Sequence, residues 1–227
     1  MANMAQAVCC FETLAASLEG RSPLSLREVE KLWTSYLATT SPDLIPADAR
    51  SSADDEAPLF VTWNTISHVD STDLTLRGCI GTFEAAPLAV SLPSYALTAA
   101  LHDPRFPPIA LIELEMISVC VTLLTNFEPC SHPLDWMIGI HGIRVQFMAD
   151  GATWNACYLP DVAVEQGWDP EECVVSCMQK SGWNGDWLNW RDVKNLAVTR
   201  FQGTKASLSF ENWQDWRKWV DEQPTQE

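Results

Sequence analysis

The stretch LRGCIGTF, residues 76–83, places one thiol between two glycines and close behind an arginine. Glycine lets a backbone take positive φ or lets another group approach closely. Gly78 and Gly81 therefore predict a shaped backbone that holds the sulfur of Cys79 at a defined place. Arg77 would lower the pKa of this thiol if the two side chains converge. The alternative is that Cys79 is a small apolar residue at a tight strand turn, because free cysteine is commonly buried.

The segments on both sides of this stretch predict a hairpin and a helix. Residues 59–63 are rich in β-branched and aromatic side chains, which indicates a strand. A polar turn at residues 68–73 separates this strand from the glycine-bracketed segment, so the two are expected to pair. A helix is predicted at residues 91–101, with Pro93 in its first turn, where proline is tolerated. Residues 103–108 follow as a stiff connector, because their prolines fix φ.

Two further helices are predicted near the N-terminus. Apolar residues recur at spacings of three and four between residues 4 and 18, and Gly20 ends the pattern. Ser25 and Glu28 then form a capping-box signature that opens a second helix. The following residues 40–57 are rich in Ser, Pro, Ala and Asp, which predicts a solvated acidic loop that is dispensable for folding.

The second half of the chain combines strands with one well-marked helix. Apolar patterns predict strands at residues 117–123, 143–147, 154–159 and 193–201. Asp169 caps a helix that has Pro170 in its first position and ends at Gly182. Strands, helices and hairpins mixed in this way indicate an α/β or α+β domain.

Several of these segments, taken in order, resemble the AMMECR domain family, which is named for the AMME-syndrome candidate-region protein. The likeness begins at Cys9-Cys10-Phe11, includes LRGCIGTF and residues 95–108, and continues through LLTNFE (123–128), GIHGI (139–143), YLP (158–160), EQGW (165–168) and TRF (199–201). It covers about residues 5–204, the predicted AMMECR-like domain. Residues 205–227 form an acidic extension in which tryptophans recur every three residues. The extension is expected to form a short helix and to be dispensable for folding.

The resemblance implies an α+β fold of two lobes. A larger mixed sheet flanked by helices and a smaller lobe would leave a cleft between them. The family has no established biochemical activity and implies no cofactor. Its prokaryotic relatives are associated with Memo-like and radical-SAM proteins, which makes these the partners that the resemblance implies. This chain has no Cys-x3-Cys-x2-Cys cluster and is therefore not the radical-SAM enzyme itself.

Composition excludes several classes of function. A net charge of −16 argues against direct binding of nucleic acid and against docking on an anionic membrane, because both need clustered Lys and Arg. Eight cysteines without a secretory signal predict reduced thiols in the cytoplasm or the nucleus. The chain has no Cys-x-x-Cys pair and no histidine cluster at zinc-finger spacing, so no metal site is predicted.

The candidate catalytic residues are Cys79 and His141, because a cysteine and a histidine that meet in space form a nucleophilic pair. A histidine in a turn is more often structural, and that alternative stays open here. The candidate binding residues are Arg77, Gly78, Gly81 and Arg105. For Arg105, anchoring of its own connector through a carboxylate is favoured over binding of an anionic ligand. Cys79 and Arg77 are predicted to line the cleft, together with His141 or its neighbouring backbone.

Two functions follow from these expectations. In the first, the protein is a cleft enzyme, or an accessory subunit of a modification pathway, with Cys79 as its reactive thiol. In the second, it is a noncatalytic protein-interaction adaptor, and the glycine-rich segment serves only the fold. A thiol with a lowered pKa in an open cleft favours the enzyme, whereas a buried and inert Cys79 favours the adaptor.

Overall fold

The computed structural model describes residues 1–45, 51–67 and 73–223. The chain forms two compact units, which are described separately. Unit 1 comprises Met1–Leu123 and Thr204–Glu227, and unit 2 comprises Leu124–Gly203. Both contain helices packed on antiparallel strands, which confirms the α+β fold class. A cleft between the two lobes stays a prediction.

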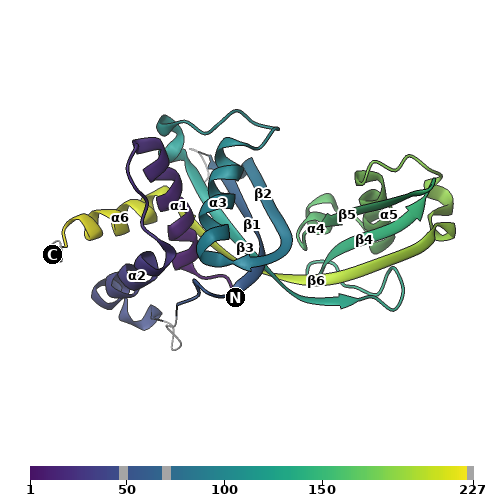
Figure 1. The fold of residues 1–227 in the computed structure, drawn as a ribbon, viewed down its shortest axis with the longest axis horizontal. Helices are drawn as coiled ribbons and strands as arrows, with labels where there is room; N and C mark the ends of the chain where they lie inside the picture. The colour runs from purple at the N-terminus through teal and green to yellow at the C-terminus, as the bar shows by residue number, and fades with distance from the viewer. Residues whose placement is uncertain (46–50, 68–72, 224–227) are drawn as a thin grey trace. The chain divides into compact units, whose positions relative to one another are not determined.

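The strands hydrogen-bond in the order β2-β1-β3-β6-β4-β5 (Figure 1). Their bounds are β1 Glu56–Ile66, β2 Leu74–Pro87, β3 Ile117–Pro129, β4 Gly142–Ala149, β5 Ala152–Tyr158 and β6 Lys194–Ser209. β1 pairs antiparallel with β2 and β3, and β4 pairs antiparallel with β5 and β6. β3 and β6 each contribute residues to both units. The pairing of β1 with β2 confirms the hairpin predicted around the glycine-bracketed segment.

Six α-helices and three short 3₁₀ helices complete the described part of the chain. The α-helices are α1 Met4–Glu19, α2 Leu26–Thr40, α3 Leu88–Leu101, α4 Val162–Gln166, α5 Pro170–Lys180 and α6 Phe210–Asp221. The 3₁₀ helices are η1 Pro42–Leu44, η2 Leu111–Met116 and η3 Trp187–Asp192. Gly20 ends α1 in the left-handed region at φ 72°, and Ser25 and Glu28 form the predicted capping box of α2.

Helix α3 begins at Leu88, three residues before the predicted start, and Pro93 lies inside it. The first N–H groups of a helix have no partner within the helix. Here the backbone N–H groups of Leu88 and Ala89 donate to the carbonyls of Asp55 and Ala53, at 2.9 and 3.1 Å. A segment distant in sequence therefore supports the first turn, which the local pattern around Pro93 does not reveal.

The core of unit 1 lies between one face of the sheet and the helices α1 and α3 (Figure 1). Leu59, Val61 and Trp63 alternate along β1 and are fully buried on this face. The indole Nε1 of Trp63 donates to the Ala96 carbonyl of α3 at 3.0 Å. The ring of Phe11, from α1, meets the Trp63 ring edge to face at 5.5 Å. These contacts tie both helices to the strand that pairs with the cysteine-bearing β2.

Helix α6 is part of this core, which argues against the expectation that residues beyond Ala206 are dispensable for folding. Trp213 and Trp216 are buried, and the Trp213 ring stacks on Phe11 with centroids 5.2 Å apart. Arg217 lies 3.5 Å from the buried carboxylate of Glu12. The tryptophan spacing predicted a helix correctly, and the same spacing places these rings on one face that covers α1.

The segment at residues 40–57 is likewise more than a solvated loop. Ala53 is fully buried, and Ser52 donates from its backbone N and from Oγ to the Glu30 carboxylate, at 2.9 and 2.6 Å. Gln6 Nε2 also donates to Ser52 Oγ at 3.0 Å. These polar contacts hold the described residues around Ser52 in a segment whose composition is poor in apolar surface. Residues 46–50, residues 68–72 of the turn predicted at 68–73, and residues 224–227 lie outside the described residues.

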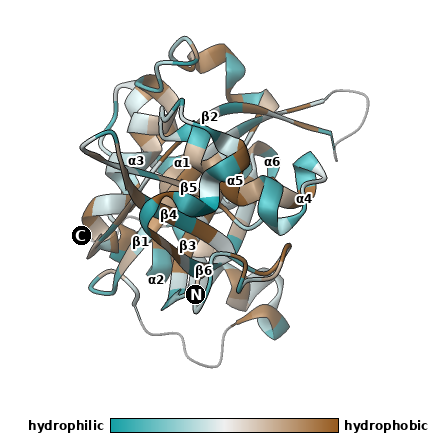
Figure 2. Cartoon of the chain, turned by 90° about the vertical axis from the view of Figure 1, so that its right-hand side faces the viewer, coloured by the Kyte–Doolittle hydropathy of each residue, from teal (hydrophilic) through white to brown (hydrophobic). Residues whose placement is uncertain are grey.

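Unit 2 has its own core between β4, β5 and helix α5. Ile143, Val145 and Phe147 are buried along β4, whereas the residues between them are exposed. Figure 2 shows hydrophobic and hydrophilic residues side by side on α5, whose apolar side includes the buried Cys173 and Cys177. Residues 150 and 151, in the turn between β4 and β5, lie in the left-handed region at φ 54° and 75°. Among the described residues, no helix combines the length and apolar character needed to cross a membrane.

Candidate functional site

The cysteine of the glycine-bracketed segment lies in a row of three side chains across the sheet of unit 1. Thr62 on β1 is opposite Cys79 on β2 and opposite Cys120 on β3. The hydroxyl of Thr62 lies 3.2 Å from the Cys79 sulfur. The two cysteines flank β1, so their strands are about 9–10 Å apart. A disulfide needs Cα atoms within about 7 Å, so this row does not bring the cysteines close enough to bridge.

The backbone of Cys79 is held by the connector that follows α3. Its N–H donates to Asp103 Oδ2 at 2.9 Å, and its carbonyl accepts from Arg105 Nη2 at 3.0 Å. Arg105 also donates to both oxygens of Asp103, at 2.9 and 2.7 Å. Asp103 is only 4% exposed, and the paired guanidinium lowers the pKa of its carboxyl far below the usual range. These are the anchoring contacts that the sequence favoured for Arg105.

The glycines on each side of Cys79 allow close approach of other backbone atoms. A Cβ on Gly78 would lie 2.1 Å from the Ala99 carbonyl oxygen, at the C-terminal part of α3. A Cβ on Gly81 would lie 2.3 Å from the carbonyl oxygen of Leu59. Neither glycine has positive φ. Of the two reasons for glycine that the sequence offered, close approach is the one found.

Arg77 is turned toward a carboxylate. It donates from Nε and Nη2 to Glu113, at 2.9 and 3.1 Å, and from Nη1 to the Pro107 carbonyl at 2.8 Å. Arg77 and Cys79 are two residues apart, and on a regular strand such residues share a face. The pairing of β1 with β2 is irregular here, because Trp63 is opposite Gly78 and the next residue, Asn64, is opposite Leu76, so that Arg77 is skipped. Such a bulge re-aims the side chain of the extra residue.

The environment of Cys79 keeps its thiol protonated. Burial raises the pKa of the thiol above its usual value, and this outweighs the lowering by the Thr62 hydroxyl and by the Arg105 charge. The lowering expected from Arg77 is not among the causes of the shift. Because the thiolate is the nucleophilic form, this geometry does not activate the sulfur.

His141 belongs to unit 2, whereas Cys79 belongs to unit 1. Nδ1 of His141 accepts a hydrogen bond from the Met137 backbone N–H at 3.0 Å, and the backbone N–H of His141 donates to the Met137 carbonyl at 2.9 Å. Gly139, in the same turn, has φ 79°. These contacts give the histidine a structural role in its turn. Its cooperation with Cys79 stays a prediction.

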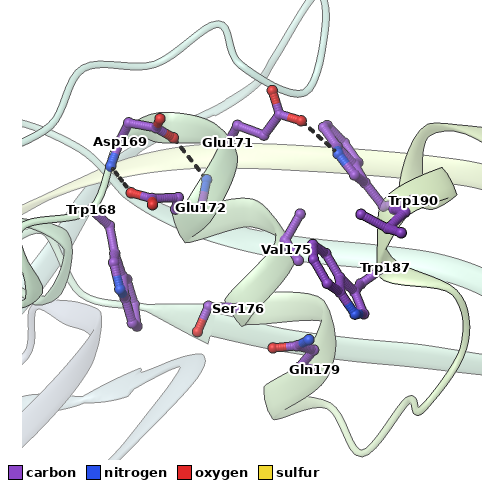
Figure 3. A pocket seen from close by; sticks show the side chains of 10 residues that line it. Trp168, Asp169, Glu171, Glu172, Val175, Ser176, Gln179, Trp187 and Trp190 are labelled. Carbon is purple, nitrogen blue, oxygen red and sulfur yellow. Dashed lines mark hydrogen bonds between the residues drawn. The ribbon is translucent and has the colours of Figure 1, made fainter.

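Sequence reasoning missed a pocket of about 480 Å³ in unit 2 (Figure 3). Trp168 stands on one side, and Trp187 and Trp190 of η3 stand on the other, with side chains of α5 between them. Trp187 is 52% exposed and Leu188 is 71% exposed. Trp187 and Trp190 stand three residues apart, and this spacing is the signal in the sequence. It does not reveal that Trp168 faces them.

Carboxylates line the part of the pocket nearest the N-terminus of α5. Asp169 and Glu172 form a capping box, each accepting the other's backbone N–H at 2.8 Å. Glu171 accepts from Trp190 Nε1 at 3.0 Å and forms an ion pair with Arg191 at 2.7 Å. Within the part of the chain that the structure describes, no three His, Cys, Asp or Glu residues are grouped to hold a metal ion.

The fold and these sites define an α+β protein of two units, with a clamped thiol in one and an aromatic, acid-lined pocket in the other. A family model with the description AMMECR1 matches residues 8–206. The chain therefore belongs to the AMMECR1 family, as the resemblance implied.

Relatives are found in distant organisms. An uncharacterized protein of Schizosaccharomyces pombe is 36% identical over 206 residues, which covers 90% of this chain and 91% of the relative. An uncharacterized protein of Arabidopsis thaliana is 39% identical over 158 residues, covering 69% of this chain and 72% of the relative. The crystal structure of an uncharacterized protein from Pyrococcus horikoshii matches with a TM-score of 0.58 and 27% identity, covering 87% of this chain and 91% of that one.

Proposed function

We propose that this AMMECR1-family protein is a noncatalytic protein-interaction module and that the pocket of unit 2 contacts its partner. The observation that carries the proposal is the exposure of Trp187 and Leu188 beside a formed pocket. Tryptophan is enriched at the centres of protein interfaces, where it supplies much of the binding energy. The Memo-like and radical-SAM proteins that the family resemblance implies are candidate partners.

The surroundings of Cys79 support an interaction module over an enzyme that uses this thiol. Both nearby arginines are bound to carboxylates of the fold, Arg77 to Glu113 and Arg105 to Asp103. Burial raises the pKa of the thiol. An anionic substrate would have to displace these carboxylates, and a nucleophilic sulfur would have to lose its proton against the effect of burial.

The reactive-thiol enzyme remains the second candidate, and one observation favours it. Cys79 is only partly buried, and the Thr62 hydroxyl and the Arg105 guanidinium both act to lower the pKa of its thiol. A change that exposed the sulfur further would leave these two stabilising groups in place. In that case Cys79 would be alkylated in the native protein faster than the other seven cysteines.

Site-specific photo-crosslinking tests the interaction module. A photoreactive amino acid at Leu188 should capture a partner from cell extract, whereas the same group at Val90, an exposed apolar residue of unit 1, should not. Excess unlabelled wild-type protein should compete, and the Trp187→Ala variant should compete poorly. A Cys79→Ser variant should compete like wild type. Equal capture from the two positions, or competition that depends on Cys79 and not on Trp187, would refute the proposal.

A further inference from the structure

We infer that the pocket of unit 2 takes a lysine or arginine side chain from a segment of the partner protein. The inference rests on the proposed function and adds the chemistry of what is bound. It follows from three properties of the pocket: its aromatic walls, the cations already placed on aromatic rings in and beside it, and its charge.

The walls of the pocket suit a long side chain with an apolar stem. Trp168 precedes α5 and Trp187 belongs to η3, and Figure 3 shows the two rings on opposite sides of the pocket. Val175 on α5 supplies an apolar surface between them. Lysine and arginine bury their methylene stems along apolar surfaces and keep the charged end near polar groups. The faces of tryptophan rings also attract a cation directly.

One ring of the pocket wall, Trp190, and one neighbouring ring, Tyr158, already hold cations of the protein itself. The guanidinium of Arg191 lies 4.5 Å from the Trp190 ring centroid, and the ammonium of Lys180 lies 4.5 Å from the Tyr158 ring centroid. The Tyr158 ring in turn packs against the Trp168 ring, with the two ring centroids 5.5 Å apart. The same group of aromatic side chains therefore binds cations within the fold, next to the walls that a ligand would contact.

The charge of the pocket selects a cation over an anion. Arg191 balances Glu171, which leaves Asp169 and Glu172 as two further negative charges on the lining. The partial positive charge of a helix N-terminus, about half an elementary charge, offsets only part of them. In the capping box each carboxylate uses one oxygen, Oδ1 of Asp169 and Oε2 of Glu172, so the second oxygen of each lies outside these two hydrogen bonds. A phosphate or carboxylate ligand would be repelled here.

Three blocked heptapeptides of the sequence Gly-Leu-Gly-X-Gly-Leu-Gly, where X is arginine, citrulline or glutamate, provide the probe. Citrulline keeps the shape of arginine and removes its charge. Binding to the isotope-labelled full chain is followed by NMR through the indole N–H signals, with the Trp187 signal assigned from Trp187→Phe. The arginine peptide should shift this signal and should bind at least about fivefold more tightly than the citrulline peptide, the ratio expected from a cation–π contact of about 1 kcal/mol.

Charge and ring variants complete the test. Asp169→Asn with Glu172→Gln keeps side chains that can cap α5 and should weaken binding of the arginine peptide about fivefold. Trp187→Ala should weaken it by a similar factor. The matched control, Glu211→Gln with Asp215→Asn on α6, removes two exposed acidic charges from unit 1 and should leave binding unchanged.

The outcomes separate this inference from the proposed function. Equal affinity for the arginine and citrulline peptides, tighter binding of the glutamate peptide, or no binding of any peptide would overturn the cation-binding inference. A partner still crosslinked from Leu188 would then leave the interaction module in place. If no partner is crosslinked from Leu188 while the arginine peptide binds tightly, the proposed function is overturned and the cation-binding inference still holds.

Discussion

Replacing Trp216 with alanine should destabilise unit 1, because this side chain is fully buried in the core that α6 shares with α1. Truncating a buried tryptophan to alanine costs about 3–5 kcal/mol. Among the described residues no acceptor hydrogen-bonds the buried Nε1–H of Trp216. Removing this unpaired N–H is stabilising and offsets part of the loss. We expect a net loss of about 3 kcal/mol in the free energy of unfolding.

Thermal unfolding followed by circular dichroism measures the loss. For a chain of this size, about 3 kcal/mol corresponds to a fall in Tm of about 6–12 °C. Hydrogen exchange should show faster exchange in α1 and no change in α5, which belongs to unit 2. Trp216→Phe, which keeps an aromatic ring and removes the unpaired N–H, should cost less than about 1 kcal/mol.

Trp187→Ala is the matched control, because it removes a tryptophan that is half exposed and lies in unit 2. Its Tm should stay within about 2 °C of wild type, since exposed substitutions usually change stability by less than about 0.5 kcal/mol. A decrease in Tm of less than about 2 °C for Trp216→Ala, or unchanged hydrogen exchange in α1, would refute the assignment of α6 to the core. Either result would support the view that the C-terminal segment is dispensable for folding.

Three further predictions concern the glycine-bracketed segment. Native Cys79 should react slowly with iodoacetamide at pH 7 and faster as pH rises above 9, because burial raises its pKa; rapid labelling at pH 7 would contradict this. Gly78→Ala should lower Tm more than Gly20→Ala, because a Cβ at Gly78 would meet the Ala99 carbonyl oxygen at 2.1 Å, whereas at Gly20 the space is open and only the left-handed φ of 72° adds strain. Asp103→Asn should cost about 2 kcal/mol at pH 7, the contribution of hydrogen bonds to a charged group. The pKa of Asp103 is lower in the folded chain than in the unfolded one, so its contribution is full above about pH 4 and is lost as pH falls further; a variant with the wild-type acid dependence would contradict this.

The local elements could be predicted because their signals are carried by adjacent residues. The capping box of Ser25 and Glu28 and the glycine that ends α1 act within one helical turn. The β1–β2 hairpin follows from β-branched and aromatic residues next to a polar turn. The start of α3 was placed too late because the groups that stabilise its first turn come from the segment before β1.

The candidate site was less predictable, because it depends on where side chains point. Cys79 and its two glycines were found from the sequence, and the reason for the glycines, contact with distant carbonyls, is visible only in the fold. Arg77 stood two residues from the thiol, but a bulge turned it toward Glu113. The pocket of unit 2 depends on Trp168 facing η3, which no short motif encodes.

The division of the chain has a consequence for how the protein forms during synthesis. Unit 2 is continuous in sequence, whereas unit 1 is interrupted between Leu123 and Thr204 and needs Trp213 and Trp216 to complete its core. Domains fold as units while the ribosome adds residues in order, and the N-terminal one usually folds first. Here we expect the reverse order. The inserted unit is complete once residue 203 has emerged, while the first 123 residues keep apolar surface exposed until α6 arrives to cover it.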